Sequence, residues 1–129
     1  MAKTDTPRVA ILMGSKNDWD SMKPAAEALE QLGVQSDVRV ISAHRTPQRH
    51  HDFVVGAADR GIEIFICGAG FAAHLAGVTA ALTPLPVLGV PLDSSALDGV
   101  DALLATSTTK IIRRTCSGCE ASYQVIYYR

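Results

Sequence analysis

The chain has 129 residues, of which 47% are apolar, and a formal net charge of −1. This length and apolar content fit one compact domain with a hydrophobic core. The charge argues against a nucleic-acid or anionic-membrane partner, because such partners select a basic surface. No apolar stretch approaches the roughly 20 residues of a membrane span, and residues 1–6 lack the apolar core of a signal peptide. The sequence therefore predicts a cytoplasmic protein.

Strand and helix patterns alternate along the chain in the order expected of βαβ units. The predicted strands are 9–13, 38–41, 63–67 and 86–90, and the predicted helices are 18–32, 46–61 and 72–82, with 96–105 as a short fourth helix or a helix–strand junction. Because a helix connects each strand to the next, the strands are expected to run parallel. The predicted fold class is α/β, a three-layer parallel sheet with helices on both faces, as in flavodoxin-like domains.

Local signals predict the helix ends. Asp18 can cap the first helix, and Gly33 supplies its end. Thr46 is the natural N-cap of the second helix, because Pro47 suits the first turn. Gly61 is expected to end that second helix.

Small and polar residues follow three of the predicted strands directly. These loops are Gly14–Asp18, Ser42–Pro47 and Gly68–His74. The carboxyl ends of parallel strands share one edge of an open sheet, and ligands bind there. Three loops of this kind at one edge predict a single binding site.

The first loop offers backbone N–H groups, the Ser15 hydroxyl and Lys16 at a helix N-terminus, which is a setting that attracts a phosphate group. It is neither a GxGxxG fingerprint nor a P-loop. A plain strand-to-helix turn is the alternative interpretation.

The second loop carries His44 and Arg45. Histidine moves protons near neutral pH, and arginine holds a carboxylate or phosphate with two parallel hydrogen bonds. A surface His and Arg that only solvate a loop are the alternative. His50 and His51 are expected to have no part in the site, because Phe53 and its neighbour already form the inner face of their helix.

In the third loop, the small residues from Gly68 to Ala73 allow a ligand to approach the backbone. His74 is predicted on the first turn of the next helix, where a neutral imidazole can donate to a carboxylate or wall a small pocket. A helix-start histidine packed against a neighbouring loop is the structural alternative.

The three cysteines do not form a disulfide framework, because their count is odd and Cys67 lies in a predicted core strand. Cys116 and Cys119 form a CxxC pair, but no second pair follows to complete a zinc site. We expect no metal site at this pair.

Four segments together resemble a known family. They are Met13–Trp19, Ser42–Pro47, Gly68–Leu75 and Thr83–Pro91. In order and spacing they are similar to the catalytic subunit of phosphoribosylaminoimidazole carboxylase, and more narrowly to the bacterial-type N5-carboxyaminoimidazole ribonucleotide mutases of purine biosynthesis. The resemblance covers residues 8–106, and the Ala72-Ala73-His74-Leu75 form of the third loop resembles the mutase class.

The resemblance implies a cofactor-free reaction, in which N5-carboxyaminoimidazole ribonucleotide releases CO2 in a closed pocket and C4 of the imidazole takes it up. It implies catalytic roles for His44 and His74, with His44 transferring the proton at the ring. The substrate-binding positions that it implies are Ser15, Asp18, Ser42, Arg45, Gly70 and Ala72. Ser15, Ser42 and Arg45 would hold the phosphate and Asp18 the ribose.

The chain also departs from the family pattern. Phe71 stands where the family usually has Gly, and Ala76 where it usually has Pro. We divide the chain into an N-terminal segment 1–7, expected to be flexible, a mutase-like domain 8–106 and an atypical tail 107–129. The tail lacks the family's usual ending, which contributes to an octamer, although residues 122–128 have strand character. A homo-oligomer is expected from the resemblance.

Two other functions stay open at this point. An inactive relative would bind a phosphorylated nucleotide without turnover. A flavodoxin-like regulatory domain would use the same sheet edge for another phosphorylated ligand.

Overall fold

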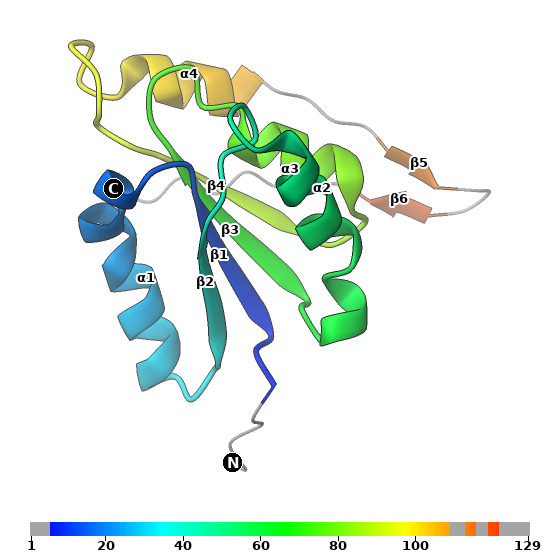
Figure 1. Cartoon of the computed structure of the whole chain (residues 1–129). Coiled ribbons are helices and arrows are strands. Elements are labelled where there is room, and N and C mark those ends of the chain that lie inside the picture. Colours follow the sequence, from blue (N-terminus) through cyan, green and yellow to red (C-terminus); the bar gives the residue numbers. More distant parts are fainter. Residues whose placement is uncertain (1–5, 109–112, 116–118, 122–129) are drawn as a thin grey trace.

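The computed structural model describes residues 6–108, 113–115 and 119–121. Four parallel strands form the main sheet in the order β2-β1-β3-β4 (Figure 1). They are β1 (Val9–Met13), β2 (Ser36–Val40), β3 (Ile64–Ala69) and β4 (Val87–Pro91). The predicted parallel α/β sheet is confirmed, with strand bounds within two residues of those expected.

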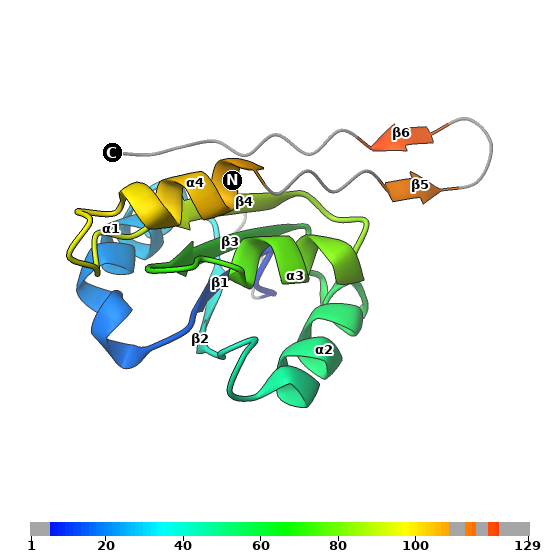
Figure 2. The ribbon, with the colours of Figure 1, turned by 90° about the horizontal axis from the view of Figure 1, so that it is seen from above.

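Helices cover both faces of this sheet, so the three-layer prediction is confirmed as well. The helices are α1 (Trp19–Gln31), α2 (Pro47–Val55), α3 (Leu75–Leu82) and α4 (Val100–Thr108). Figure 2 shows α1 and α4 on one side of the sheet and α2 and α3 on the other. A separate antiparallel pair is formed by β5 (Arg113–Thr115) and β6 (Cys119–Ala121). None of the described helices combines the length and apolar character that a membrane span requires.

The alternation of side chains along β1 divides the core into two layers. Ala10 and Leu12 face α2 and α3 in one buried cluster, whereas Val9, Ile11 and Met13 belong to the cluster that packs on α1. All five residues are buried, as expected for a central strand that is covered on both faces. The first site loop therefore extends from a strand that is buried on both faces.

The start of α1 differs in part from the prediction. Asp18 holds the N-cap position of α1, as predicted, but its side chain makes no capping hydrogen bond to this helix, because a 3₁₀ turn (Lys16–Asp18) that is capped by Ser15 precedes it. Asp18 is the other half of a capping box, with its Oδ2 accepting the Ser15 backbone N–H at 3.0 Å. The end at Gly33 is confirmed, since its φ of +72° allows Val34 N–H to reach back to Leu29 in a Schellman motif.

The other helices are shorter than expected. Thr46 holds the N-cap position of α2, but its hydroxyl donates to the Ser42 carbonyl instead of capping the helix. The second helix stops at Val55, and a separate 3₁₀ turn (Ala58–Arg60) leads to Gly61, whose φ is +88°. The third and fourth helices begin three and four residues later than predicted, at 75 and 100 instead of 72 and 96.

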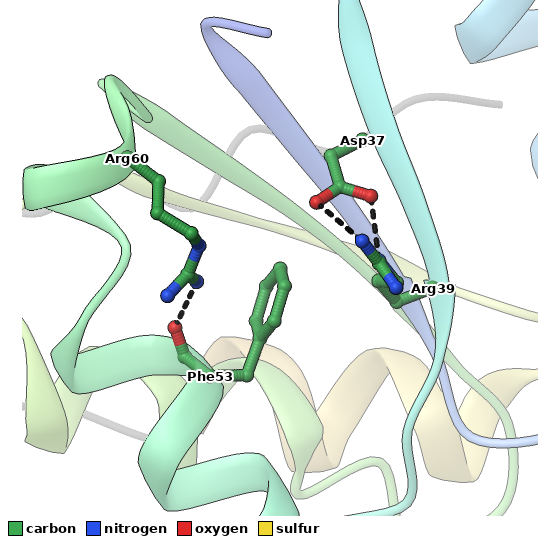
Figure 3. A network of polar contacts seen from close by, with 4 residues as sticks. All are labelled: Asp37, Arg39, Phe53 and Arg60. Carbon is green, nitrogen blue, oxygen red and sulfur yellow. Dashed lines mark hydrogen bonds and ion pairs between the residues drawn. The ribbon is translucent and has the colours of Figure 1, made fainter.

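Phe53 of α2 packs against the edge of the core and contacts Arg39 of the edge strand β2. Its ring lies under two guanidinium groups, with Arg39 Cζ 5.8 Å and Arg60 Cζ 4.6 Å from the ring centroid. Figure 3 shows these groups together with the ion pair from Arg39 to Asp37 at 2.6 Å and the Arg60 hydrogen bond to the Phe53 carbonyl. Such cation–π contacts stabilise by about 0.5–1 kcal/mol each at exposed positions.

His50 corrects a sequence-based expectation. Phe53 and Val54 were expected to fill the inner face of its helix, but His50 is 1% exposed and its Nε2 lies 2.8 Å from the Thr79 hydroxyl of α3. The wrong assumption was that Phe53 and its neighbour occupy the whole inner face of α2. His51 is exposed, as expected, and Cys67 is buried.

Several expectations fall on residues outside the described ranges. They concern residues 1–5, Cys116 and the strand character of 122–128. These expectations, and the domain limits at 7 and 106, stay predictions.

Burial of His50 predicts an acid-sensitive component of stability. The pKa of His50 is lowered from its ordinary value of 6.5, mainly by burial and to a smaller extent by the nearby His51. The folded state therefore binds a proton on His50 less readily than the unfolded chain does. The stability that neutral His50 contributes is fully present above about pH 6.5 and is lost as the pH falls toward the folded pKa. Between about pH 7 and about pH 5, the unfolding free energy of the wild type should fall more steeply than that of His50→Leu, by at most about 1.4 kcal/mol per pH unit.

Urea unfolding across this pH range measures the two slopes. The exposed variant His51→Gln should keep most of the wild-type slope and serves as the control. Equal slopes for the wild type and His50→Leu would contradict the assignment of this component to His50.

Candidate active site

The loop after β1 is held by its own side chains. Ser15 Oγ accepts the Asn17 backbone N–H at 3.2 Å, while the Asp18 carboxylate accepts the backbone N–H of Ser15. Because the Ser15 oxygen acts as the acceptor, its hydroxyl proton can be donated to a ligand. The capping box thus presents a hydroxyl and a carboxylate at the sheet edge.

The loop after β2 is a tight turn around Ser42. Ser42 Oγ accepts the Arg45 backbone N–H at 3.2 Å, and the Ser42 carbonyl accepts the Thr46 backbone N–H at 2.9 Å. The Arg45 guanidinium then reaches across the sheet edge and donates to the Gly14 carbonyl. This bond joins the first two loops and places a positive charge beside Ser15.

The three loops and the end of β4 enclose a cavity of about 290 Å³, near the lower limit of ligand pockets, which is roughly 300 Å³. All eight predicted site residues line it, namely Ser15, Asp18, Ser42, His44, Arg45, Gly70, Ala72 and His74. Lys16 is not among the lining residues. The sequence patterns thus group the loops that meet at this cavity, and the phosphate role expected of Lys16 stays a prediction.

Two histidines from different loops meet at the cavity. His44 Nε2 lies 3.0 Å from His74 Nδ1, and the rings are nearly perpendicular at 79° with centroids 5.1 Å apart. When both rings are neutral, one of these nitrogens carries the proton and the other accepts it. His74 stands at the N-cap of α3, just before the helix instead of on its first turn. The pair can therefore hold one mobile proton beside a ligand.

Ser94 is a polar residue of the cavity that was not predicted. It follows β4, and Leu92 N–H donates to the Ala69 carbonyl at 2.9 Å, which extends the strand pairing to this point. A methyl group on Gly70 would overlap Ser94 Oγ, so glycine is needed for the close approach of the two loops. The rule that selected the first three loops would have indicated Ser94 if it had been applied to the fourth strand.

Phe71 stands in a strained position on the cavity wall. Its φ is +54°, in the left-handed region that residues other than glycine seldom adopt. Its side chain is 60% exposed, so little burial compensates the strain. The position explains why the resembled family usually has Gly here.

The described residues contain no group of three His, Cys, Asp or Glu side chains that could hold a metal ion.

A family model described as AIR carboxylase matches residues 8–111. The chain belongs to this family. The N5-carboxyaminoimidazole ribonucleotide mutase of Pyrococcus abyssi is 54% identical over 105 residues, which cover 81% of this chain and 60% of that protein. The mutase of Vibrio cholerae is 57% identical over 95 residues, covering 74% and 59% of the two chains. A bifunctional purine synthesis protein purC/E of Dictyostelium discoideum is 57% identical over 99 residues, which are 77% of this chain and 10% of that protein.

Solved structures agree with this family membership. The crystal structure of Treponema denticola PurE superposes with a TM-score of 0.74 at 25% identity, covering 94% of this chain and 72% of that chain. The chain spans about 60% of the length of the mutases that it matches. The AIR carboxylase fold and the cavity at its sheet edge lie within the matched residues.

The backbone at Phe71 yields a stability prediction. Phe71→Gly should remove a left-handed strain of about 1–2 kcal/mol at a cost of about 0.5–1 kcal/mol in unfolded-chain entropy. The expected result is a net rise in unfolding free energy of about 0.5–1 kcal/mol, measured by urea denaturation.

Phe71→Ala is the matched control, because it removes the ring and keeps a Cβ at the positive φ. It should give no stabilisation. If Phe71→Ala stabilised the protein as much as Phe71→Gly, the exposed ring and not the backbone would be the source of the effect.

Proposed function

We propose that this chain is an N5-carboxyaminoimidazole ribonucleotide mutase of purine biosynthesis. The proposal is supported chiefly by the contact of His44 with His74 in a cavity whose residues lie within the range 8–111 that the AIR carboxylase family model matches. The identity of 54–57% to the named mutases supports it as well. The reaction moves a carboxylate from N5 to C4 of the imidazole and needs no cofactor.

The phosphate of the nucleotide would bind at the joined first and second loops. Arg45 supplies a positive charge, and Ser15 and Ser42 supply hydroxyl groups at the same end of the cavity. Guanidinium and hydroxyl donors match phosphate oxygens in charge and hydrogen bonding. Asp18, on the next turn, would accept hydrogen bonds from the ribose hydroxyls.

The chemical step needs one proton carrier. When the C–N5 bond breaks, CO2 leaves and N5 takes up a proton; when C4 attacks CO2, a new C–C bond forms and C4 loses its proton. The net change is one proton moved from C4 to N5, so a single imidazole can donate the first proton and accept the second. We assign this transfer to His44, with His74 holding the His44 ring through their 3.0 Å contact.

CO2 would be held between the two half-reactions by the third loop. The Gly70 and Ala72 positions line the cavity beside His74 and present small side chains and backbone. Keeping CO2 next to a nucleophilic carbon replaces a bimolecular encounter with a positioned one, which lowers the barrier through entropy.

We also propose a homo-oligomeric state and a cytoplasmic location. The outer surface of α4 and the turn before it carry exposed apolar side chains, with Leu97 62% and Val100 53% exposed. Such patches usually mark protein–protein contacts. Light scattering of the purified chain tests the assembly, and a monodisperse monomer would contradict it.

The proposed chemistry makes His44 the decisive residue. His44→Asn should lower kcat by about 10²- to 10⁴-fold while the affinity for the nucleotide product changes little, since the phosphate contacts remain. The measurement is the conversion of N5-carboxyaminoimidazole ribonucleotide without ATP, together with calorimetric binding of the product.

Lys23→Gln is the control, because Lys23 is exposed on α1, pairs with Glu27 and does not line the cavity, and it should keep wild-type turnover. Undiminished turnover in His44→Asn would contradict the assignment. Binding without turnover by the wild type would overturn the proposed mutase activity and support a binding protein instead.

A further inference from the structure

A chain of buried polar side chains joins three elements behind the cavity. His50 of α2 lies 2.8 Å from Thr79 Oγ1 of α3, and Cys67 Sγ of β3 lies 3.6 Å from the same oxygen. Thr79 Oγ1 in turn donates to the Leu75 carbonyl at 2.8 Å. His50, Thr79 and Cys67 are each no more than 1% exposed. None of the three lines the cavity.

The hydrogen-bond directions in this chain follow from the Thr79 hydroxyl. Its single proton goes to the Leu75 carbonyl, so its oxygen must accept from both His50 and Cys67. His50 therefore carries a proton on Nε2 and donates it here, whether the ring is neutral or charged. Burial lowers the pKa of His50 and so favours its neutral form.

Each of the three joined elements is directly continuous with a site loop. α2 begins directly after the turn that carries His44, and α3 begins directly after His74. Cys67 is on β3, which ends at the cavity residue Ala69. Two contacts thus join the segment of α2 to the segment of α3. His44 contacts His74 in the cavity, and His50 contacts Thr79 in the core.

Apolar packing alone would hold α2 against α3 with less constraint. Apolar contacts tolerate small sliding movements, whereas hydrogen bonds at 2.8 Å weaken when donor and acceptor move apart or lose alignment. A buried polar group that loses its partner is also destabilising. The polar chain therefore favours one arrangement of the two helices over neighbouring ones.

We propose that His50 is a positioning residue that fixes α2 against α3 through Thr79 and thereby sets the geometry of His44 relative to His74. The importance of this geometry for turnover rests on the proposed mutase function. The geometric effect itself does not need turnover.

The first test observes the imidazole rings directly. The chain has four histidines, so ¹⁵N-resolved NMR can assign each ring by substitution and follow its titration. His50→Leu, which removes the donor, should shift the imidazole signals of both His44 and His74. His50→Gln, whose amide can donate from a similar position, should restore them toward the wild type.

Val54→Ala is the matched control for lost stability. Val54 is a buried apolar residue of the same helix, 1% exposed and in the core cluster, and it takes no part in the polar chain. It should destabilise the fold and leave the His44 and His74 signals in place. Unshifted signals in His50→Leu, or equal shifts in Val54→Ala, would overturn the proposal.

The second test uses turnover. His50→Leu should lower kcat by about 2- to 30-fold, leave KM nearly unchanged and alter the pH profile of kcat. If the wild type proves inactive, the mutase function fails while the NMR test still decides on positioning. If the wild type is active, and His50→Leu keeps the wild-type kcat and the wild-type imidazole signals of His44 and His74, only the positioning proposal fails.

Discussion

The parallel register of four strands is the constraint on which the rest of this structure depends. Met13 at the end of β1 pairs with Val40 of β2 and with Gly68 of β3, and Ala69 of β3 pairs with Pro91 of β4. The four strands therefore end at one level, and the loops that follow them meet. Antiparallel strands would have sent half of these loops to the opposite edge. Short bonds between loops, such as Arg45 to Gly14, then complete the cavity.

Around this edge the structure contains features that lower its stability. Phe71 adopts a left-handed backbone conformation on the cavity wall, and His50 and Thr79 are polar side chains that are buried in the core. Strain and buried polar groups of this kind tend to gather at functional sites, where the surrounding fold holds them in place. Their position next to the two histidines of the cavity agrees with a site that must hold its geometry closely.

Much of this arrangement was predictable because it depends on local patterns. Apolar runs such as Val9–Met13 and glycine at the end of α1 carry their structural meaning in a few neighbouring residues. The alignment of the strand ends then follows from the alternation of strands and helices. For this reason the cavity residues could be grouped from the sequence alone.

The parts that could not be predicted depend on contacts distant in sequence. The partner of His50 is 29 positions away on another helix. The pattern of apolar residues in α2 alone therefore cannot indicate that His50 has a buried partner. Asp18 precedes α1 as predicted, but its carboxylate accepts the Ser15 N–H because a 3₁₀ turn comes before the helix, and helix ends are decided by such small differences. Ser94 follows a strand end like the other site loops, but its close approach to Gly70 depends on the pairing of β3 with β4.

The proposed function requires that this cavity transfer a carboxylate within one bound nucleotide. The most direct measurement supplies N5-carboxyaminoimidazole ribonucleotide with a ¹³C-labelled carboxylate in unlabelled bicarbonate buffer and follows the label by NMR. A CO2 that stays in the cavity next to His44 and His74 predicts a C4-carboxylated product that retains the label. An unlabelled product would show that CO2 escapes and returns from solution, and the absence of product would contradict the proposed function itself.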